Sequence, residues 1–297
     1  MENLVFSKAM SMHVTTYKIL NDKGEQLVSL LQQFFDLFLG YIEEDLDIMI
    51  EFMNGKEKTM QMNNKNISKV YDYFLQGKIE CLDIFHYYDL HDEAMDRHYP
   101  GLYTVGISCN QASTYSPELA KSRIFPNSFS LSLNERLFNN YIPSHVQNDF
   151  VDLFKQAIIL LEGVTGFITY ESTAASSYTR TPFETHWSID TSSPPGYTQR
   201  LRGYFWLNYL STHHINQLGG LDCIRKNAPC GVIESLDQQD KLGLLLGLTD
   251  NINDYSDDQL RKLREYFWPL LGIGIEDNNE HVPSFEYPPR YIARLVE

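Results

Sequence analysis

The sequence predicts an α+β fold in which helices pack on mixed or antiparallel sheets. The 297-residue chain is 43% hydrophobic, which is enough to bury a sizeable core. Strand-like and helix-like patterns alternate along it, in the order β-α-β-β-α-β near both ends. We therefore expect a single domain, 1–297, with two ferredoxin-like halves at about 10–90 and 200–297 and a middle β-β-α-β section at 100–200.

The first half begins with a strand expected at 11–20. Asn21 or Asp22 then caps a helix whose apolar residues recur at helical spacing: Leu27, Leu30, Leu31, Phe34, Phe35 and Phe38. Asn54 and Gly55 divide the segment 46–62 into two strand-like arms, and both residue types tolerate positive φ, which predicts a hairpin. A second helix around 67–75 ends before Gly77, and a strand follows at 81–87.

The middle section contains two alternating patterns that predict half-buried strands at 103–109 and 128–133. A helix is expected to begin near Ser144 and to end at Gly163, before a strand at 166–171. The stretch 172–199 is rich in Ser, Thr and Pro, so we expect a long loop that is functional or mobile. Trp187 and Tyr197 are expected to dock part of this loop on the body of the protein.

The last hundred residues open with the apolar run from Tyr204 to Leu210, which predicts a core strand covered on both faces, at 203–210. The following helix, at 212–218, is expected to end at the two glycines 219 and 220. Further elements are then expected in this order: strands at 231–236 and 242–248, a helix at 257–268 with a capping box formed by Ser256 and Gln259, and a strand at 291–296.

The segment from Arg200 to Gly220 carries a resemblance when it is taken together with 221–229 and with the closing sequence Tyr266-Phe-Trp-Pro269. It resembles the bacterial family of type VI immunity proteins for VRR-type nucleases, most clearly over 128–271. The positions that carry the pattern are Arg202, Gly203, Trp206, Gly219, Gly220 and Trp268. The resemblance implies a cytoplasmic protein that binds and blocks a toxic nuclease delivered by type VI secretion.

The charge balance is acidic, with a formal net charge of −15 and a pI near 5.0. Nucleic-acid binding needs clustered Lys and Arg, so direct binding to DNA or RNA is not expected. An acidic surface suits a basic protein partner such as a DNA-cleaving enzyme, although many cytosolic proteins are acidic for solubility alone. No run approaches the length that spans a bilayer, and the N-terminus does not read as a signal peptide, which favours the cytoplasm. The oligomeric state is not predicted.

Three acidic groups are the candidate partner-binding residues. Each by itself is typical of a solvated face or a helix cap, but two of them meeting on one surface with exposed Tyr would supply charge for steering and rings for affinity. The groups are Glu43, Glu44, Asp45 and Asp47; Asp89, Asp92, Glu93 and Asp96; and Asp250 and Asp254, with Asp257 and Asp258 after them.

Evidence for catalysis is weak. No nucleophile motif, H-E-x-x-H pair or phosphate-binding glycine loop is present, so we expect no enzyme activity and no cofactor or metal. The alternatives are immunity to a different toxin class, or a metal-dependent hydrolase that uses His86, Asp89 and His91 or His213. The residues 89, 91 and 93 would share one face of a strand, which leaves His86 on the other. The cysteines at 81, 109, 223 and 230 form no C-x-x-C pair and are expected to be reduced and mostly buried.

Overall fold

The computed structural model describes residues 8–42, 45–86, 91–92, 97–98, 103–110, 125–171, 183–184, 196–237 and 241–271. Within them ten strands form one sheet, in which every neighbouring pair is antiparallel. From edge to edge the order is β11 (Val232–Ser235), β12 (Gly243–Gly247), β10 (Leu207–Ser211), β9 (Thr165–Glu171), β1 (Ala9–Thr16), β8 (Asn127–Asn134), β7 (Tyr103–Ser108), β4 (Ile79–Phe85), β2 (Asp47–Phe52) and β3 (Glu57–Gln61).

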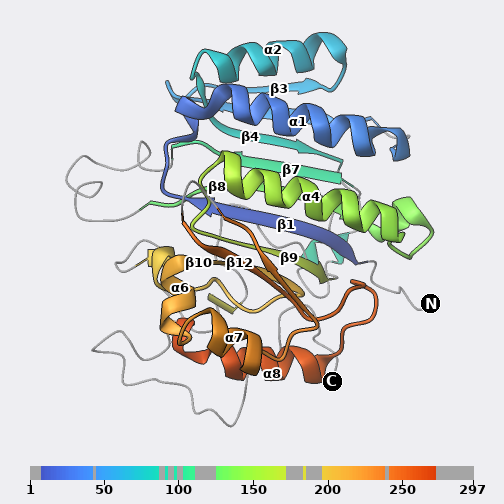
Figure 1. The fold of residues 1–297 in the computed structure, drawn as a ribbon. Coiled ribbons are helices and arrows are strands. Elements are labelled where there is room, and N and C mark those ends of the chain that lie inside the picture. Colours follow the sequence, from blue (N-terminus) through green and yellow to red (C-terminus); the bar gives the residue numbers. More distant parts are fainter. Residues whose placement is uncertain are drawn as a thin grey trace.

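The helices form two groups along this sheet (Figure 1). Across the half that contains β1 to β4 lie α1 (Gly24–Phe38), α2 (Asn64–Leu75) and α4 (Ser144–Leu160), with α1 between the other two. Beside the other end of the sheet lie α6 (Thr212–Gln217), α7 (Leu221–Asn227) and α8 (Asp257–Phe267). The predicted α+β class is therefore confirmed. A separate two-stranded sheet pairs β5 (His91–Asp92) with β6 (Arg97–His98).

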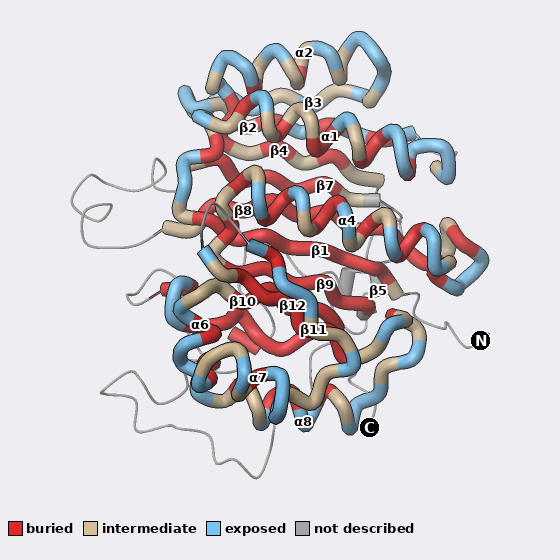
Figure 2. Tube along the Cα trace, in the orientation of Figure 1, coloured by how far each residue is buried: buried red, intermediate tan, exposed pale blue. Residues whose placement is uncertain are grey.

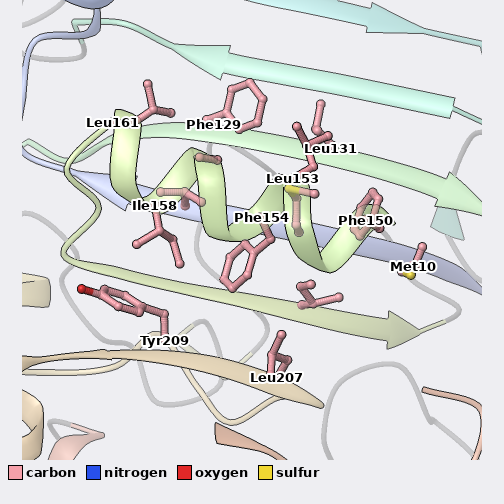
Figure 3. Packing of buried hydrophobic residues seen from close by; sticks show 14 of the residues in the cluster. Met10, Phe129, Leu131, Phe150, Leu153, Phe154, Ile158, Leu161, Leu207 and Tyr209 are labelled. Carbon is pink, nitrogen blue, oxygen red and sulfur yellow. The ribbon is translucent and has the colours of Figure 1, made fainter. Parts of the chain in front are cut away.

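The core lies between α4 and the central strands (Figure 3). Phe150, Phe154 and Ile158 recur at helical spacing on α4, and all three side chains are fully buried. They lie over Met10 of β1 and Phe129 of β8. Burying each large apolar side chain contributes about 1.5–3 kcal/mol, so this layer is a main source of stability. Figure 2 shows the same pattern, with buried central strands and helices that alternate between buried and exposed positions.

Several local predictions are confirmed. Asn54 and Gly55 lie in the turn between β2 and β3, where Gly55 has a φ of +73° and Phe52 N donates to Lys56 O at 2.9 Å. Helix α8 begins with the predicted capping box, in which the Ser256 hydroxyl accepts from Gln259 N at 3.3 Å. These short-range signals are reliable because turn and cap chemistry involves neighbours in the chain.

The start of α1 differs from the prediction. A 3-10 turn, η1 (Leu20–Lys23), precedes the helix, and no side chain caps its first residue, Gly24. Asn21 instead donates from Nδ2 to the Gly77 carbonyl at 2.9 Å, which joins η1 to the end of α2. At the end of α4, Glu162 rather than Gly163 takes the left-handed conformation, with a φ of 53°. Gly163 allows a close approach, because an added Cβ would lie 2.9 Å from Val14 Cγ1.

One prediction in this region is wrong, and one helix was missed. β10 begins at Leu207 instead of 203, because residues 200–206 are buried without regular structure. Gly219 and Gly220, with φ values of 89° and 87°, do end α6, but the chain then enters α7 directly, a helix that was not predicted. A φ near +90° suits glycine and lets two short helices meet at an angle.

The ferredoxin-like layout of the halves is not confirmed. The element order β-α-β-β-α-β holds for the first half, yet β1 pairs with β8 and β9 instead of with strands of its own half. The strands β7 and β8 lie between β4 and β1. The cysteines are free as expected, but only Cys109 is fully buried and the other three are half-buried. The predicted strand 291–296, Trp187 and most of the loop 172–199 lie outside the described residues, although Tyr197 is buried as expected.

Candidate protein-binding surface

Two exposed tyrosines lie close to the start of α4. Tyr41, in the 3-10 turn η2 (Leu39–Tyr41) after α1, is 40% exposed and Tyr141 is 52% exposed. The Tyr41 ring meets the Phe138 ring edge-on at 4.9 Å, and its hydroxyl lies 3.2 Å from His145 Nε2. Both rings therefore present a large face to solvent while local contacts hold them in place, as is common for side chains at protein interfaces.

The loop 249–254 lies beside Tyr141 and carries Asp250 and Asp254, both exposed. Asn251 Nδ2 donates to the Tyr141 hydroxyl at 3.3 Å. Asp45 is also exposed and is only four residues beyond Tyr41, hence within about 14 Å of it along the chain. We call this exposed set the Tyr41–Tyr141 surface; it consists of Leu39, Tyr41, Asp45, Tyr141, Asp250 and Asp254.

A buried amide holds the acidic loop against α4. Gln147 Nε2 donates to the Asp250 carbonyl at 2.8 Å, and Gln147 Oε1 accepts from Ile252 N at 2.8 Å. Only 5% of Gln147 is exposed, so both bonds are shielded from water. Because one buried side chain bonds two points of the loop backbone, the backbone that carries Asp250 is held in a defined position.

Further bonds make the loop rigid. Asn253 N donates to Asn251 Oδ1 at 2.9 Å, a local turn typical of Asn, and Asn253 Nδ2 donates to the Ile142 carbonyl at 3.0 Å. Behind the loop, Trp206 Nε1 donates to Thr249 Oγ1 at 3.0 Å. Trp206, one of the residues that carry the family resemblance, therefore supports this loop from the core.

The three segments that build this surface, 39–45, 139–147 and 249–256, contain no Lys or Arg. They contain the carboxylates of Glu43, Glu44, Asp45, Asp250 and Asp254. Asp45 of the first predicted acidic group and Asp250 and Asp254 of the third thus lie in segments next to the two exposed tyrosines. Glu43 and Glu44 lie outside the described residues, and Asp47 is exposed at the start of β2.

The side chains of the second predicted acidic group lie outside the part of the chain that the structure describes. Asp89, Glu93 and Asp96 lie outside the described residues, and Asp92 and His91 are described only as backbone in β5. Of the two adjacent histidines, His213 is exposed and His214 is buried, as their 100° separation on a helix requires. Burial lowers the pKa of His214 to about 4. Among the described residues, no three His, Cys, Asp or Glu side chains gather as metal ligands do.

A buried polar cluster that the sequence did not reveal lies around Arg202, 6% exposed. Arg202 Nη2 donates to Glu184 Oε2 at 3.0 Å, and Nη1 lies 2.5 Å from His13 Nε2 in β1. The Tyr197 hydroxyl donates to Glu184 Oε1, and its backbone N donates to the Tyr17 hydroxyl at 2.7 Å. The cluster therefore joins β1 to the segment 196–206.

Burial and the ion pair together determine the direction of the pKa shifts in this cluster. Burial alone would lower the pKa of Arg202, but the carboxylate of Glu184 outweighs it and the pKa is raised. Burial and the charge of Arg202 lower the pKa of His13, so its ring is neutral and its Nε2 accepts from the guanidinium. The signal in the sequence was the two arginines, Arg200 and Arg202, just before an aromatic run, because a buried charge needs a partner.

The remaining motif residues shape the backbone and do not lie on the Tyr41–Tyr141 surface. An added Cβ at Gly203, whose φ is 155°, would lie 2.9 Å from Phe205 Cζ. Gly220 precedes α7, and Trp268 is half-buried in the 3-10 turn η6 (Trp268–Leu270). The residues that carry the resemblance therefore have structural roles: they shape the fold, and Trp206 supports the acidic loop.

No family model and no curated protein matches the chain. Among solved structures, the Pseudomonas aeruginosa T6SS protein PA0821 is similar, with a TM-score of 0.58 and 13% sequence identity over 93% of this chain and 76% of that one. The two proteins share a fold. Within the described part of the chain, every helix is too short or too polar to cross a membrane.

Proposed function

We propose that this protein is an immunity protein that binds and neutralises a cognate nuclease toxin of type VI secretion, of the VRR type. The observation that carries the proposal is the Tyr41–Tyr141 surface, where exposed Asp45, Asp250 and Asp254 lie in the same segments as two exposed tyrosines or next to them, and these segments lack Lys and Arg. Two likenesses support it: the shared fold with a T6SS protein and the sequence resemblance over 128–271. The protein acts in the cytoplasm, without catalysis or a cofactor, and binds neither nucleic acid nor membrane.

Inhibition would follow from covering the DNA-binding groove or the active site of the nuclease. Such a groove is basic because it contacts phosphates, and Asp250 and Asp254 present the complementary charge. Charge complementarity accelerates association and suppresses wrong partners, while Tyr41 and Tyr141 supply apolar area for affinity. The bonds of Gln147 hold the acidic loop before the partner arrives, which reduces the entropy lost on binding.

Co-expression with a VRR-type nuclease toxin of a type VI secretion system tests the proposal. Cells that carry both genes should survive, and the purified protein should stop plasmid cleavage by the nuclease. Survival no better than with an empty vector would refute immunity to that toxin. Protection against a toxin that does not cleave DNA would keep immunity but refute the nuclease assignment.

The surface is tested separately. Tyr41→Ala and Tyr141→Ala should each weaken nuclease binding by about tenfold or more, as truncation of interface tyrosines does. Leu75→Ala is a matched control, because Leu75 is a 56% exposed apolar residue on α2, away from this surface. Equal affinities for all three variants and the wild type would show that another surface binds the toxin.

A further inference from the structure

The strand β3 forms one edge of the ten-stranded sheet and pairs only with β2 (Figure 1). Backbone bonds from Phe52 N to Lys56 O at 2.9 Å and from Met62 N to Leu46 O at 2.7 Å lie at the two ends of this pairing. Since bonded pairs alternate in an antiparallel ladder, Lys58 and Met60 bond to β2. Glu57 and Thr59 therefore point their N–H and C=O groups away from the sheet.

In the described part of the chain, no backbone partner pairs with these outward N–H and C=O groups. The Gln61 carbonyl accepts from Asn66 Nδ2 at 2.8 Å, which closes one end of the edge. No described backbone group outside the sheet bonds to the backbone of Glu57 or Thr59. Figure 2 shows β3 as exposed and intermediate where the central strands are buried. An open edge of this kind is a template for a further strand.

The outer face of this edge is acidic. The side chains of Asp47, Glu51 and Glu57 share the sheet face that points away from α2, and Glu51 lies directly opposite Glu57. Burial, Glu80 and Glu57 raise the pKa of Glu51. Like charges in directly opposed positions repel. None of these three carboxylates forms an ion pair with a described residue.

The cation of the same strand faces the other way. Lys58 Nζ lies over the Tyr73 ring of α2, 5.9 Å from its centroid, so it does not neutralise the outer face. The opposite edge of the sheet differs, because Glu234 of β11 pairs with Lys155 at 2.9 Å. Pairing of β3 with a second copy of itself would bring two acidic faces together and is disfavoured. The charge thus favours an occupant of opposite sign.

We propose that β3 accepts an extended segment of a basic partner protein as an additional strand. The partner strand bonds to the backbone of Glu57 and Thr59 and carries Lys or Arg at alternate positions, on the sheet face that holds Glu57 and, one strand further in, Glu51. Exposed Met49 lies on the same sheet face, opposite Thr59 and one strand further in, where a long side chain of the partner strand can contact it. This inference goes beyond the proposed function, because it concerns another surface and requires no toxin.

A synthetic peptide tests it on the full-length protein. The probe is a capped heptapeptide of alternating Lys and Thr, and the readout is amide hydrogen exchange followed by NMR. Saturating peptide should slow exchange at the Thr59 N–H at least tenfold, because that group gains an acceptor. A peptide with Glu in place of Lys should give no protection. No slowing with the Lys peptide, or equal slowing with both, would overturn the proposal.

Two variants separate charge from backbone pairing. Replacing Glu51→Gln together with Glu57→Gln should weaken peptide binding about threefold to tenfold, as expected for two exposed charge pairs. Thr59→Pro removes only an outward N–H, which proline at such an edge position tolerates, and it should abolish the slowing of exchange at the Glu57 N–H, the other outward group. Glu265→Gln on α8 is the matched control and should bind as the wild type does.

If Thr59→Pro does not fold, the variant with both Glu51→Gln and Glu57→Gln provides the test. Unchanged affinity of this variant for the Lys peptide would refute the proposed pairing of β3 with a basic strand. Sedimentation of the protein without peptide provides a second check. A monomer is expected, and a dimer that Thr59→Pro dissociates would make a second copy the occupant and overturn the proposal. Because no nuclease is present in these experiments, their failure leaves the proposed immunity function standing.

Discussion

Arg202 and Glu184 form an ion pair inside the protein, with 3.0 Å between Nη2 and Oε2 and side chains that are 7% and 1% exposed. The guanidinium also reaches His13 on the central strand β1. The residues of this cluster come from the first strand, from 183–184 and from 196–206. A buried charge network of this kind couples distant parts of the chain, and its removal has measurable effects.

Arg202→Ala should reduce the free energy of unfolding by about 3–5 kcal/mol, because it leaves the carboxylate of Glu184 buried and unpaired. Urea unfolding followed by circular dichroism measures the loss. Arg261→Ala, which removes an exposed partner of Asp258, is the control and should change the midpoint little. Equal losses in the two variants would contradict a special role for the buried pair.

Stability should fall as the pH drops from about 6.5 toward 4. Burial depresses the pKa of His214 to about 4, so the unfolded chain, with its normal histidine pKa, binds more protons in this range. The loss from His214 is about 3 kcal/mol at most, since one pKa unit corresponds to about 1.4 kcal/mol. His13, also neutral, acts in the same direction.

The variant His214→Gln should flatten this pH dependence. Glutamine retains a side chain that can complete the capping box with Ser211 but cannot be protonated. Unfolding midpoints between pH 7 and pH 4.5 compare the two proteins. A curve parallel to that of the wild type would assign the titration to other groups.

Gln147→Leu should destabilise the protein by about 1–3 kcal/mol, because the Asp250 carbonyl and the Ile252 N–H lose their partner in a buried position. Exchange of the Ile252 amide should accelerate more than that of amides in α2. Gln147→Glu retains the acceptor for Ile252 and should preserve part of the protection. Unchanged exchange in Gln147→Leu would show that the loop does not depend on this clamp.

Gly243→Ala should be strongly destabilising. An added Cβ would lie 2.2 Å from the Leu236 carbonyl oxygen and 2.7 Å from Tyr209 Cε2, and backbone cannot yield as a flexible side chain can. Gly40→Ala is the control, because nothing lies within 4 Å of its added Cβ. Thermal unfolding should show a lowered midpoint only for the first variant.

The association rate with the nuclease should fall about tenfold or more between low and high salt if Asp250 and Asp254 steer the encounter. Replacing both by Asn should reduce the rate at low salt and remove most of its salt dependence. Stopped-flow mixing measures the rates. A flat response of the wild type would refute steering and leave binding itself untouched.

Local chemistry was read correctly from the sequence where it depends on neighbouring residues. Gly55 in its turn and Ser256 at its helix cap each act within four residues of their partners. The start of β10 was misplaced because the apolar run from 204 gives no sign that Asn208 bonds back to Phe205, at 3.1 Å to its N and 2.8 Å to its carbonyl. This side chain closes a compact turn that ends just before the strand.

The long-range arrangement could not be predicted in the same way. Arg202 lies 189 residues from His13, and no pattern of spacing links them. The sequence pointed to acidic residues of the candidate surface but not to Tyr41 and Tyr141, because the exposure of these tyrosines depends on how the end of α1 lies against the start of α4. Gln147 looked like an ordinary helical residue, and only the fold reveals its bonds.

The position of β1 at the middle of the sheet has a consequence for synthesis on the ribosome. Its neighbours β8 and β9 begin at Asn127 and Thr165, whereas β1 ends at Thr16. At 5–20 residues per second, roughly 6 to 22 s separate the translation of β1 from that of the first residue able to pair with it. During that interval a strand with apolar Met10, Met12 and Val14 has two open sides, so nascent chains should depend on a chaperone that holds this segment.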